Sequence, residues 1–144
     1  MCSNNLKLPI RAAPYRHQRE AAAFALDRLA DGGGAALLME MGTGKTLTTI
    51  AIVGRLWQEK RVQRLLVVAP LSILGVWEDE FRKFADYDYS LAVLEGSGAR
   101  KMDTIRHMTG AALQVLVVNY ESAWRLEKEL AAWKPDCIVC DEGH

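Results

Sequence analysis

Two short stretches of the sequence carry residue types suited to phosphate chemistry. The first is "MGTGKT" at residues 41–46, and the second is the acidic pair "DE" at residues 141–142. In the first stretch, two glycines let the backbone take positive φ and turn successive N–H groups toward an anion. A lysine then supplies a point charge for phosphates, and a threonine supplies a hydroxyl for Mg²⁺ at the start of a helix whose dipole favours phosphate. The predicted nucleotide-binding residues of this loop are Met41, Gly42, Thr43, Gly44, Lys45 and Thr46.

The acidic pair would supply the groups that a bound triphosphate needs for hydrolysis. Such a reaction requires a carboxylate that holds Mg²⁺, usually through its waters, and a second group that positions or deprotonates the attacking water. Two carboxylates after a buried strand are costly unless they face a cation or solvent. We therefore assign Asp141 to the metal together with Thr46, Glu142 to the water, and Lys45 to the phosphates. The alternatives are a plain glycine-rich turn at 42–46 and a solvated acidic loop at 141–142.

Five short apolar runs must position these residues. The runs are residues 35–41, 64–70, 90–96, 114–120 and 136–142, and each resembles a strand buried on both faces. Apolar residues recur at helical spacing between the runs, and the expected helices are about 17–30, 47–54, 74–84, 100–108 and 123–133. This alternation predicts a doubly wound α/β domain, a parallel sheet with helices on both faces, in which ligands bind at the carboxyl ends of the strands.

Composition predicts one domain without a strongly basic surface. The chain has 144 residues, and 18 Lys plus Arg balance 18 Asp plus Glu, so any DNA contact must be local. No signal peptide or membrane span is found, which predicts an intracellular, soluble protein (cytoplasmic if bacterial or phage) with no membrane partner. Cys137 and Cys140 are expected to be buried thiols on opposite faces of a strand. Trp77 and Trp133 lie on apolar helical faces and are expected in the core, not as platforms for stacking bases.

Four segments together resemble the first RecA-like lobe of Swi/Snf-related ATPases, within helicase superfamily two. They are "EMGTGKT", "VVAPLSILGVWEDEFRKF", "VVNYESAW" and "CIVCDEGH", and the resemblance runs from about residue 8 to residue 144. Met39 stands where the general phosphate-loop pattern has its first glycine, and members of this superfamily do not require that glycine. The resemblance implies a RecA-like P-loop domain over residues 1–144, incomplete at its C-terminus, with ATP and Mg²⁺ as cofactors.

The resemblance also implies roles for residues outside the two stretches. Gln18, in "PYRHQREA", would recognise adenine through its amide, and is otherwise a helix-surface residue. Pro70 and Ser72 would lie along a nucleic-acid backbone, and Asn119 and Tyr120 would form a second turn of this kind. The alternative for each turn is an ordinary connection from strand to helix, with Ser72 as a helix cap.

The implied function is that of the nucleotide-binding half of a DNA-dependent ATPase that moves along double-stranded DNA. His144 closes the "DEGH" motif and would couple the ATP site to a later segment. In this family a second lobe supplies arginines to the γ phosphate, and no second lobe stands in this sequence. We therefore expect the chain alone to bind nucleotide weakly and to hydrolyse it poorly or not at all.

Other functions remain open at the level of sequence. One is the motor lobe of another superfamily-two protein, of the restriction-enzyme or RNA helicase type, although a DEAD-box protein would have alanine and aspartate where Gly143 and His144 stand. Another is an ATP-binding module without turnover. A small-molecule kinase is disfavoured because "DEGH" provides a glutamate that can activate water.

Overall fold

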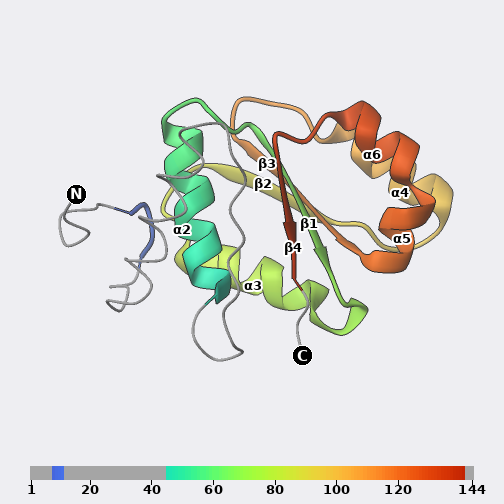
Figure 1. Ribbon diagram of the computed structural model, residues 1–144, viewed down its shortest axis with the longest axis horizontal. Helices are drawn as coiled ribbons and strands as arrows, with labels where there is room; N and C mark the ends of the chain where they lie inside the picture. Colours follow the sequence, from blue (N-terminus) through green and yellow to red (C-terminus); the bar gives the residue numbers. More distant parts are fainter. Residues whose placement is uncertain (1–7, 12–44, 142–144) are drawn as a thin grey trace.

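The computed structural model of the chain describes residues 8–11 and 45–141. Within them, four strands form one sheet in the order β2-β3-β1-β4 (Figure 1), and every pairing is parallel. The strands are β1 Arg64–Ala69, β2 Tyr89–Val93, β3 Leu113–Asn119 and β4 Cys137–Cys140. The predicted parallel sheet is confirmed. The strand predicted at 35–41 and the helix predicted at 17–30 lie outside the described residues.

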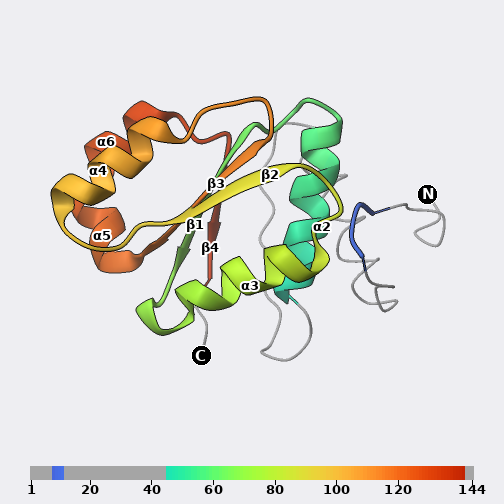
Figure 2. The same ribbon diagram turned by 180° about the vertical axis from the view of Figure 1, so that it is seen from behind.

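Helices cover both faces of this sheet, as the alternating pattern predicts. On one face lie α2 (Lys45–Gln58) and α3 (Leu74–Phe84), the latter preceded by the 3-10 turn η2 (Leu71–Ile73). On the other lie α4 (Gly98–His107), α5 (Tyr120–Arg125) and α6 (Glu127–Trp133) (Figures 1 and 2). Residues 8–11 contact the end of α3 through a bridge from Ile10 to Ala85. None of the helices in the described ranges is long and apolar enough to cross a membrane.

The alternation of side chains along the strands divides the core into two clusters. Leu65 and Val67 of β1 pack toward α2 and α3, and Leu66 and Val68 of the same strand pack toward α4, α5 and α6. Trp77 belongs to the first cluster and Trp133 to the second, so the prediction that both are core residues is confirmed. The residues of interest lie just after the carboxyl ends of these strands.

The helix predicted at 123–133 is interrupted. α5 and α6 meet at Leu126, whose φ of −101° and ψ of 19° depart from helical values. Two i to i+4 hydrogen bonds continue across the break, from Leu126 N–H to the Ser122 carbonyl and from Leu130 N–H to the Leu126 carbonyl. The apolar side chains therefore still pack on one face: Ala123, Leu126, Leu130 and Trp133.

The prediction that β4 is buried on both faces is wrong. Cys137 and Val139 are partly buried against the first cluster, but Ile138 is 58% exposed and Cys140 is exposed. The cause is that the described sheet ends at β4, and the helices on the second face lie over β1, β2 and β3 (Figures 1 and 2). The two cysteines do point to opposite faces, as predicted. The Cys137 thiol is partly buried, but the Cys140 thiol is exposed, so the prediction of a buried thiol is wrong for Cys140.

Candidate functional site

Asp141 lies directly after β4 and is only 5% exposed. Its backbone N–H donates to the Val68 carbonyl at 2.8 Å, which extends the β1–β4 pairing beyond Cys140. The indole Nε1–H of Trp77 donates to its carboxylate Oδ2 at 3.0 Å, and the Tyr120 hydroxyl donates to its backbone carbonyl at 3.0 Å. These three contacts from β1, α3 and α5 orient a carboxylate at the carboxyl end of the sheet.

The first turn of α2 lies at the same end of the molecule as the carboxyl ends of β1 and β4 (Figures 1 and 2). α2 begins at Lys45, and Thr46 in its first turn is partly buried. The hydroxyl of Thr46 and the carboxylate of Asp141 are oxygen ligands of the kind that Mg²⁺ prefers. The indole of Trp77 that orients Asp141 is a neutral donor of one hydrogen bond. The two residues therefore fit a Mg²⁺ ion that keeps several of its waters.

The remaining residues of the predicted ATP site cannot be placed, because they lie outside the described residues. They are Gln18, Met41, Gly42, Thr43, Gly44, Glu142 and His144. Within residues 8–11 and 45–141, no group of three or more His, Cys, Asp or Glu side chains could hold a metal ion.

An open cleft of about 530 Å³ lies where β1, β2 and β3 end. Its lining includes Leu71 after β1, Glu95 and Gly96 after β2, and Asn119 and Ser122 at the end of β3. Gly96 has a φ of 88°, a left-handed conformation that favours glycine and turns the chain from β2 toward α4. The cleft therefore gathers three connections that are far apart in the sequence, as expected at the carboxyl ends of parallel strands.

Two cations face the cleft, and they differ in how they are held. Arg125 forms a 2.7 Å ion pair with Glu121, and both side chains are exposed. Lys101 donates from Nζ to the Oγ of Ser122 at 2.8 Å, a neutral acceptor that is nearly buried. Lys101 therefore places its ammonium group at the cleft wall, although Glu78 and Glu95 also line the cleft.

Sequence reasoning did not single out Lys101. A local signal for its position exists, because Ser97 caps α4 by accepting a hydrogen bond from the backbone N–H of Arg100 at 3.2 Å. This cap fixes the helix start just after β2, so Lys101 lies one turn into α4 and near the strand ends.

The two predicted backbone-contacting turns lie at this cleft. Pro70 and Ser72 flank Leu71, which lines the cleft, and Ser72 is exposed. Ser72 lies inside η2 and Pro70 takes the cap position without a side-chain hydrogen bond, so the alternative that Ser72 is a helix cap is wrong. Asn119 lines the cleft, whereas the hydroxyl of Tyr120 is directed to Asp141. The contact of these residues with nucleic acid remains a prediction.

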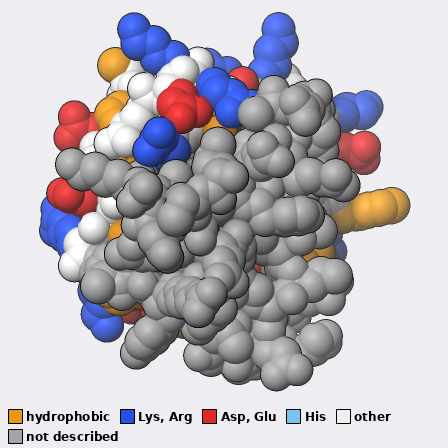
Figure 3. All heavy atoms as spheres, turned by 60° about the vertical axis from the view of Figure 1, so that its left-hand side comes forward, with side chains coloured by type: hydrophobic (Ala, Val, Ile, Leu, Met, Phe, Trp, Pro, Cys, Tyr) orange, Lys and Arg blue, Asp and Glu red, His pale blue; other side chains and the backbone are white. Residues whose placement is uncertain are grey.

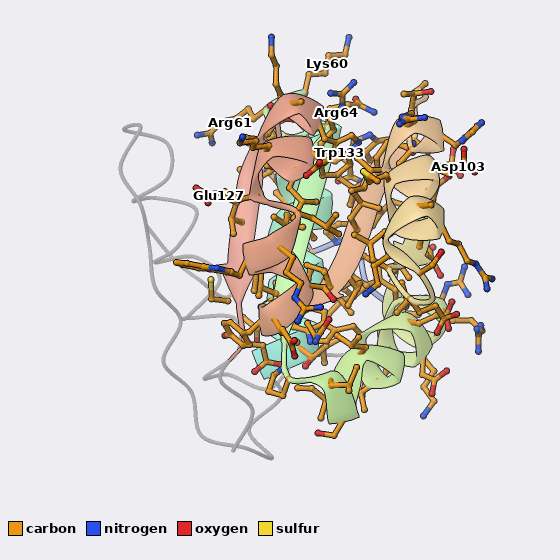
Figure 4. The ribbon with its side chains drawn as sticks, turned by 90° about the vertical axis from the view of Figure 1, so that its right-hand side faces the viewer. Lys60, Arg61, Arg64, Asp103, Glu127 and Trp133 are labelled. Atoms are coloured by element: carbon orange, nitrogen blue, oxygen red, sulfur yellow. The ribbon has the colours of Figure 1, made fainter. Side chains whose placement is uncertain are left out.

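Other basic side chains gather at the opposite end of the sheet. Lys60, Arg61 and Arg64 lie near the start of β1 (Figure 4), and Lys and Arg side chains project along the same upper edge in Figure 3. Arg64 lies over the ring of Trp133, 5.8 Å from its centroid, and donates to the Trp133 carbonyl. Arg61 lies 3.7 Å from Glu59. These groups lie at the amino end of the sheet and are separate from the cleft.

Comparison with known protein families and sequences identifies similar proteins along most of the chain. The family model described as "SNF2-related domain" matches residues 17–144. The DNA repair and recombination protein RAD54-like of Drosophila ananassae is 31% identical over 144 residues, which cover 89% of this chain and 18% of that protein. The chain thus spans 18% of the length of this relative.

Solved structures show the same fold. The Sulfolobus solfataricus SWI2/SNF2 ATPase core domain is 27% identical with a TM-score of 0.76, and the match covers 99% of this chain and 28% of that one. The Sulfolobus solfataricus SWI2/SNF2 ATPase core in complex with dsDNA is 22% identical with a TM-score of 0.72, covering 96% of this chain and 34% of that one. The resemblance identified from the sequence motifs is therefore confirmed, and the chain belongs to the SNF2-related domain family.

Proposed function

We propose that residues 1–144 form the nucleotide-binding lobe of a DNA-dependent ATPase that moves along double-stranded DNA. The observation that carries the proposal is the buried Asp141 carboxylate, oriented by Trp77 at the same end of the molecule as the first turn of α2. Family membership supports it. So do the names of two similar proteins, one a DNA repair protein and one an ATPase core solved with dsDNA.

Each residue of the ATP site has a distinct task in this proposal. Lys45 would bind the β and γ phosphates together with the backbone N–H groups of residues 42–44, and Gln18 would select adenine. Thr46 and Asp141 would hold Mg²⁺, which when bound neutralises charge on the phosphates. Glu142 would orient the attacking water, and His144 would couple the site to other parts of the protein.

The cleft at the strand ends would hold the DNA backbone. Backbone recognition needs hydrogen-bond donors and a local positive charge, and it reads no bases. Pro70, Ser72, Asn119 and Tyr120 would supply the two turns, and Lys101 would supply the charge, since its ammonium is bound to a neutral hydroxyl. This local arrangement suits a chain whose net charge is zero.

A polypeptide of these 144 residues contains one lobe, so we expect it to bind ATP with little turnover. Arginines delivered by a second lobe would be needed for the full rate, and such an arginine contributes roughly 10³- to 10⁵-fold. Binding, not hydrolysis, is therefore the suitable assay for this chain.

The first test is equilibrium binding of a fluorescent ATP analogue with and without Mg²⁺. Asp141→Asn is expected to abolish the gain in affinity that Mg²⁺ provides, and Lys45→Ala to abolish binding. Asp136→Asn is the matched control, because Asp136 precedes the same strand at its other end and accepts hydrogen bonds from Gln63 and Arg64. Wild-type chain that is folded and binds no analogue would refute the proposed nucleotide site.

The second test is binding of a duplex DNA at several salt concentrations. Lys101→Ala is expected to weaken binding irrespective of base sequence and to reduce the slope of log affinity against log salt by about one. Lys60→Ala is the control, since Lys60 lies at the opposite end of the sheet (Figure 4). Equal effects of the two substitutions would show that DNA does not bind in the cleft.

A further inference from the structure

Trp77 and Tyr120, both outside β4, contact Asp141 through their side chains. Trp77 of α3 bonds the carboxylate, and Tyr120 at the start of α5 bonds the carbonyl of the same residue, each at 3.0 Å. The two helices lie on opposite faces of the sheet (Figures 1 and 2). Asp141 is thus the point at which α3 and α5 are joined by hydrogen bonds.

Both helices also form walls of the cleft. Gly75 and Glu78 of α3 line it on either side of Trp77 in sequence. Glu121 and Ser122 of α5 line it directly after Tyr120. A ligand that presses on either wall therefore acts on a short, rigid segment that ends in a hydrogen bond to Asp141.

The side chains of Trp77 and Tyr120 differ in how far they can move in the folded domain. Trp77 is 1% exposed, so its indole cannot turn away from the carboxylate without opening the core. Tyr120 is 43% exposed, so its ring can move and its hydroxyl bond can form or break while the domain stays folded. Trp77 is suited to hold the carboxylate at all times, and Tyr120 is suited to respond to what occupies the cleft.

We propose that Tyr120 couples occupancy of the cleft to the nucleotide site through its hydrogen bond to Asp141, with Trp77 as the fixed positioning residue for the carboxylate. This inference rests on the proposed function, which assigns DNA to the cleft and Mg²⁺ with nucleotide to Asp141. It adds a second role to the place of Tyr120 in the predicted DNA-binding turn, because the tyrosine hydroxyl acts on the aspartate.

The size of the coupling follows from the bond involved. One neutral hydrogen bond contributes roughly two- to tenfold to an equilibrium. Saturating duplex DNA should therefore change the affinity for Mg²⁺ and nucleotide by roughly two- to tenfold, and nucleotide should change the affinity for DNA by the same factor, because coupling between two ligands is reciprocal.

The experiment measures the dissociation constant of a fluorescent ATP analogue for the 144-residue chain in the presence of Mg²⁺. It is measured once alone and once in the presence of a saturating 20-base-pair duplex, which is about two turns of DNA. Tyr120→Phe keeps the ring and removes only the hydroxyl. It should bring the ratio of the two constants to about one. Trp77→Phe should lower analogue affinity in both conditions, by roughly ten- to a hundredfold, as loss of a group that orients a metal ligand does.

Tyr87→Phe is the matched control. It also removes a tyrosine hydroxyl that donates to a backbone carbonyl, at 2.9 Å, but the acceptor is Ile50 in α2. This variant should keep the wild-type ratio.

Three other results would contradict the inference, and they can be told apart. A Tyr120→Phe chain with an unchanged ratio, or a wild-type ratio of one, overturns the coupling and leaves the proposed function standing. A Tyr120→Phe chain that binds DNA alone much more weakly makes the hydroxyl a DNA contact instead. Folded wild-type chain that binds neither ligand overturns the inference together with the proposed function.

Discussion

Gly54 lets α2 lie close to the ring of Tyr87, and its replacement by alanine should destabilise the domain. A Cβ at Gly54 would stand 2.2 Å from Cε1 of Tyr87 and 2.7 Å from Cδ1, much closer than two carbon atoms can approach. The ring cannot simply turn away, because its hydroxyl donates to the Ile50 carbonyl at 2.9 Å and its face contacts Trp57 at a centroid distance of 5.9 Å.

The expected cost follows from these contacts. Overpacking of a core costs about 1–3 kcal/mol, and displacing the ring adds the loss of one hydrogen bond, about 1 kcal/mol. We therefore take about 3 kcal/mol as the cost. The substitution also stabilises helix α2 by about 1 kcal/mol, since glycine is a poorer helix former than alanine. The net loss in the free energy of unfolding should be about 2 kcal/mol for Gly54→Ala.

Urea denaturation followed by circular dichroism measures this loss. Gly75→Ala is the matched control, because Gly75 is also helical and nothing lies within 4 Å of its added Cβ, so this variant should be as stable as wild type or slightly more so. In a Tyr87→Leu background the cost of Gly54→Ala should shrink, since the ring is gone. A Gly54→Ala chain as stable as wild type, or a cost that persists without the ring, would refute the reasoning.

Three further predictions concern buried groups. Burial raises the pKa of Tyr87 above its ordinary value of 10.0. The contribution of the neutral phenol to the free energy of unfolding is therefore fully present below pH 10 and falls above it as the unfolded chain ionises, by up to about 1.4 kcal/mol per pH unit. Urea midpoints measured from pH 8 to 11 should show this fall, and Tyr87→Phe should make the fall smaller. Burial also raises the pKa of the Cys137 thiol, so a maleimide followed by mass spectrometry should label the exposed Cys140 first, and equal rates would contradict the fold of β4. Trp133→Phe removes a 2.9 Å hydrogen bond from the indole to the buried Met108 carbonyl and should lower the free energy of unfolding, measured by urea denaturation, by about 1–3 kcal/mol. The control is Trp124→Phe: the Trp124 side chain is 81% exposed, so this substitution should change the free energy of unfolding by less than about 0.5 kcal/mol.

Most of the fold could be predicted from local patterns. The apolar runs at 64–70 and 114–120 became β1 and β3, the central strands of the described sheet, because both of their faces are buried. The segment 74–84 became α3 with unchanged bounds, since its apolar residues repeat at helical spacing and its aromatic side chains fill the core.

The errors share a physical cause, which is that exposure depends on neighbours that a local pattern does not contain. The apolar run at 136–142 indicates a strand but not its position at the side of the described sheet, and this position exposes Ile138 and Cys140. In the same way, no sequence pattern shows that the hydroxyl of Tyr120 reaches the carbonyl of Asp141.

The site depends on packing that lies outside it. Thr46 stands in the first turn of α2, and the position of this helix against the sheet depends on the close approach of Gly54 to Tyr87. Asp141 in turn depends on Trp77, whose indole is held by the same core cluster that contains Ile50 and Val53 of α2. The groups predicted to bind Mg²⁺ are therefore positioned by one continuous core. Gly54→Ala should for this reason weaken binding of the ATP analogue even under conditions in which the chain remains folded, and Gly75→Ala should not. Loss of stability without loss of affinity would show that the two ends of α2 respond independently to its packing.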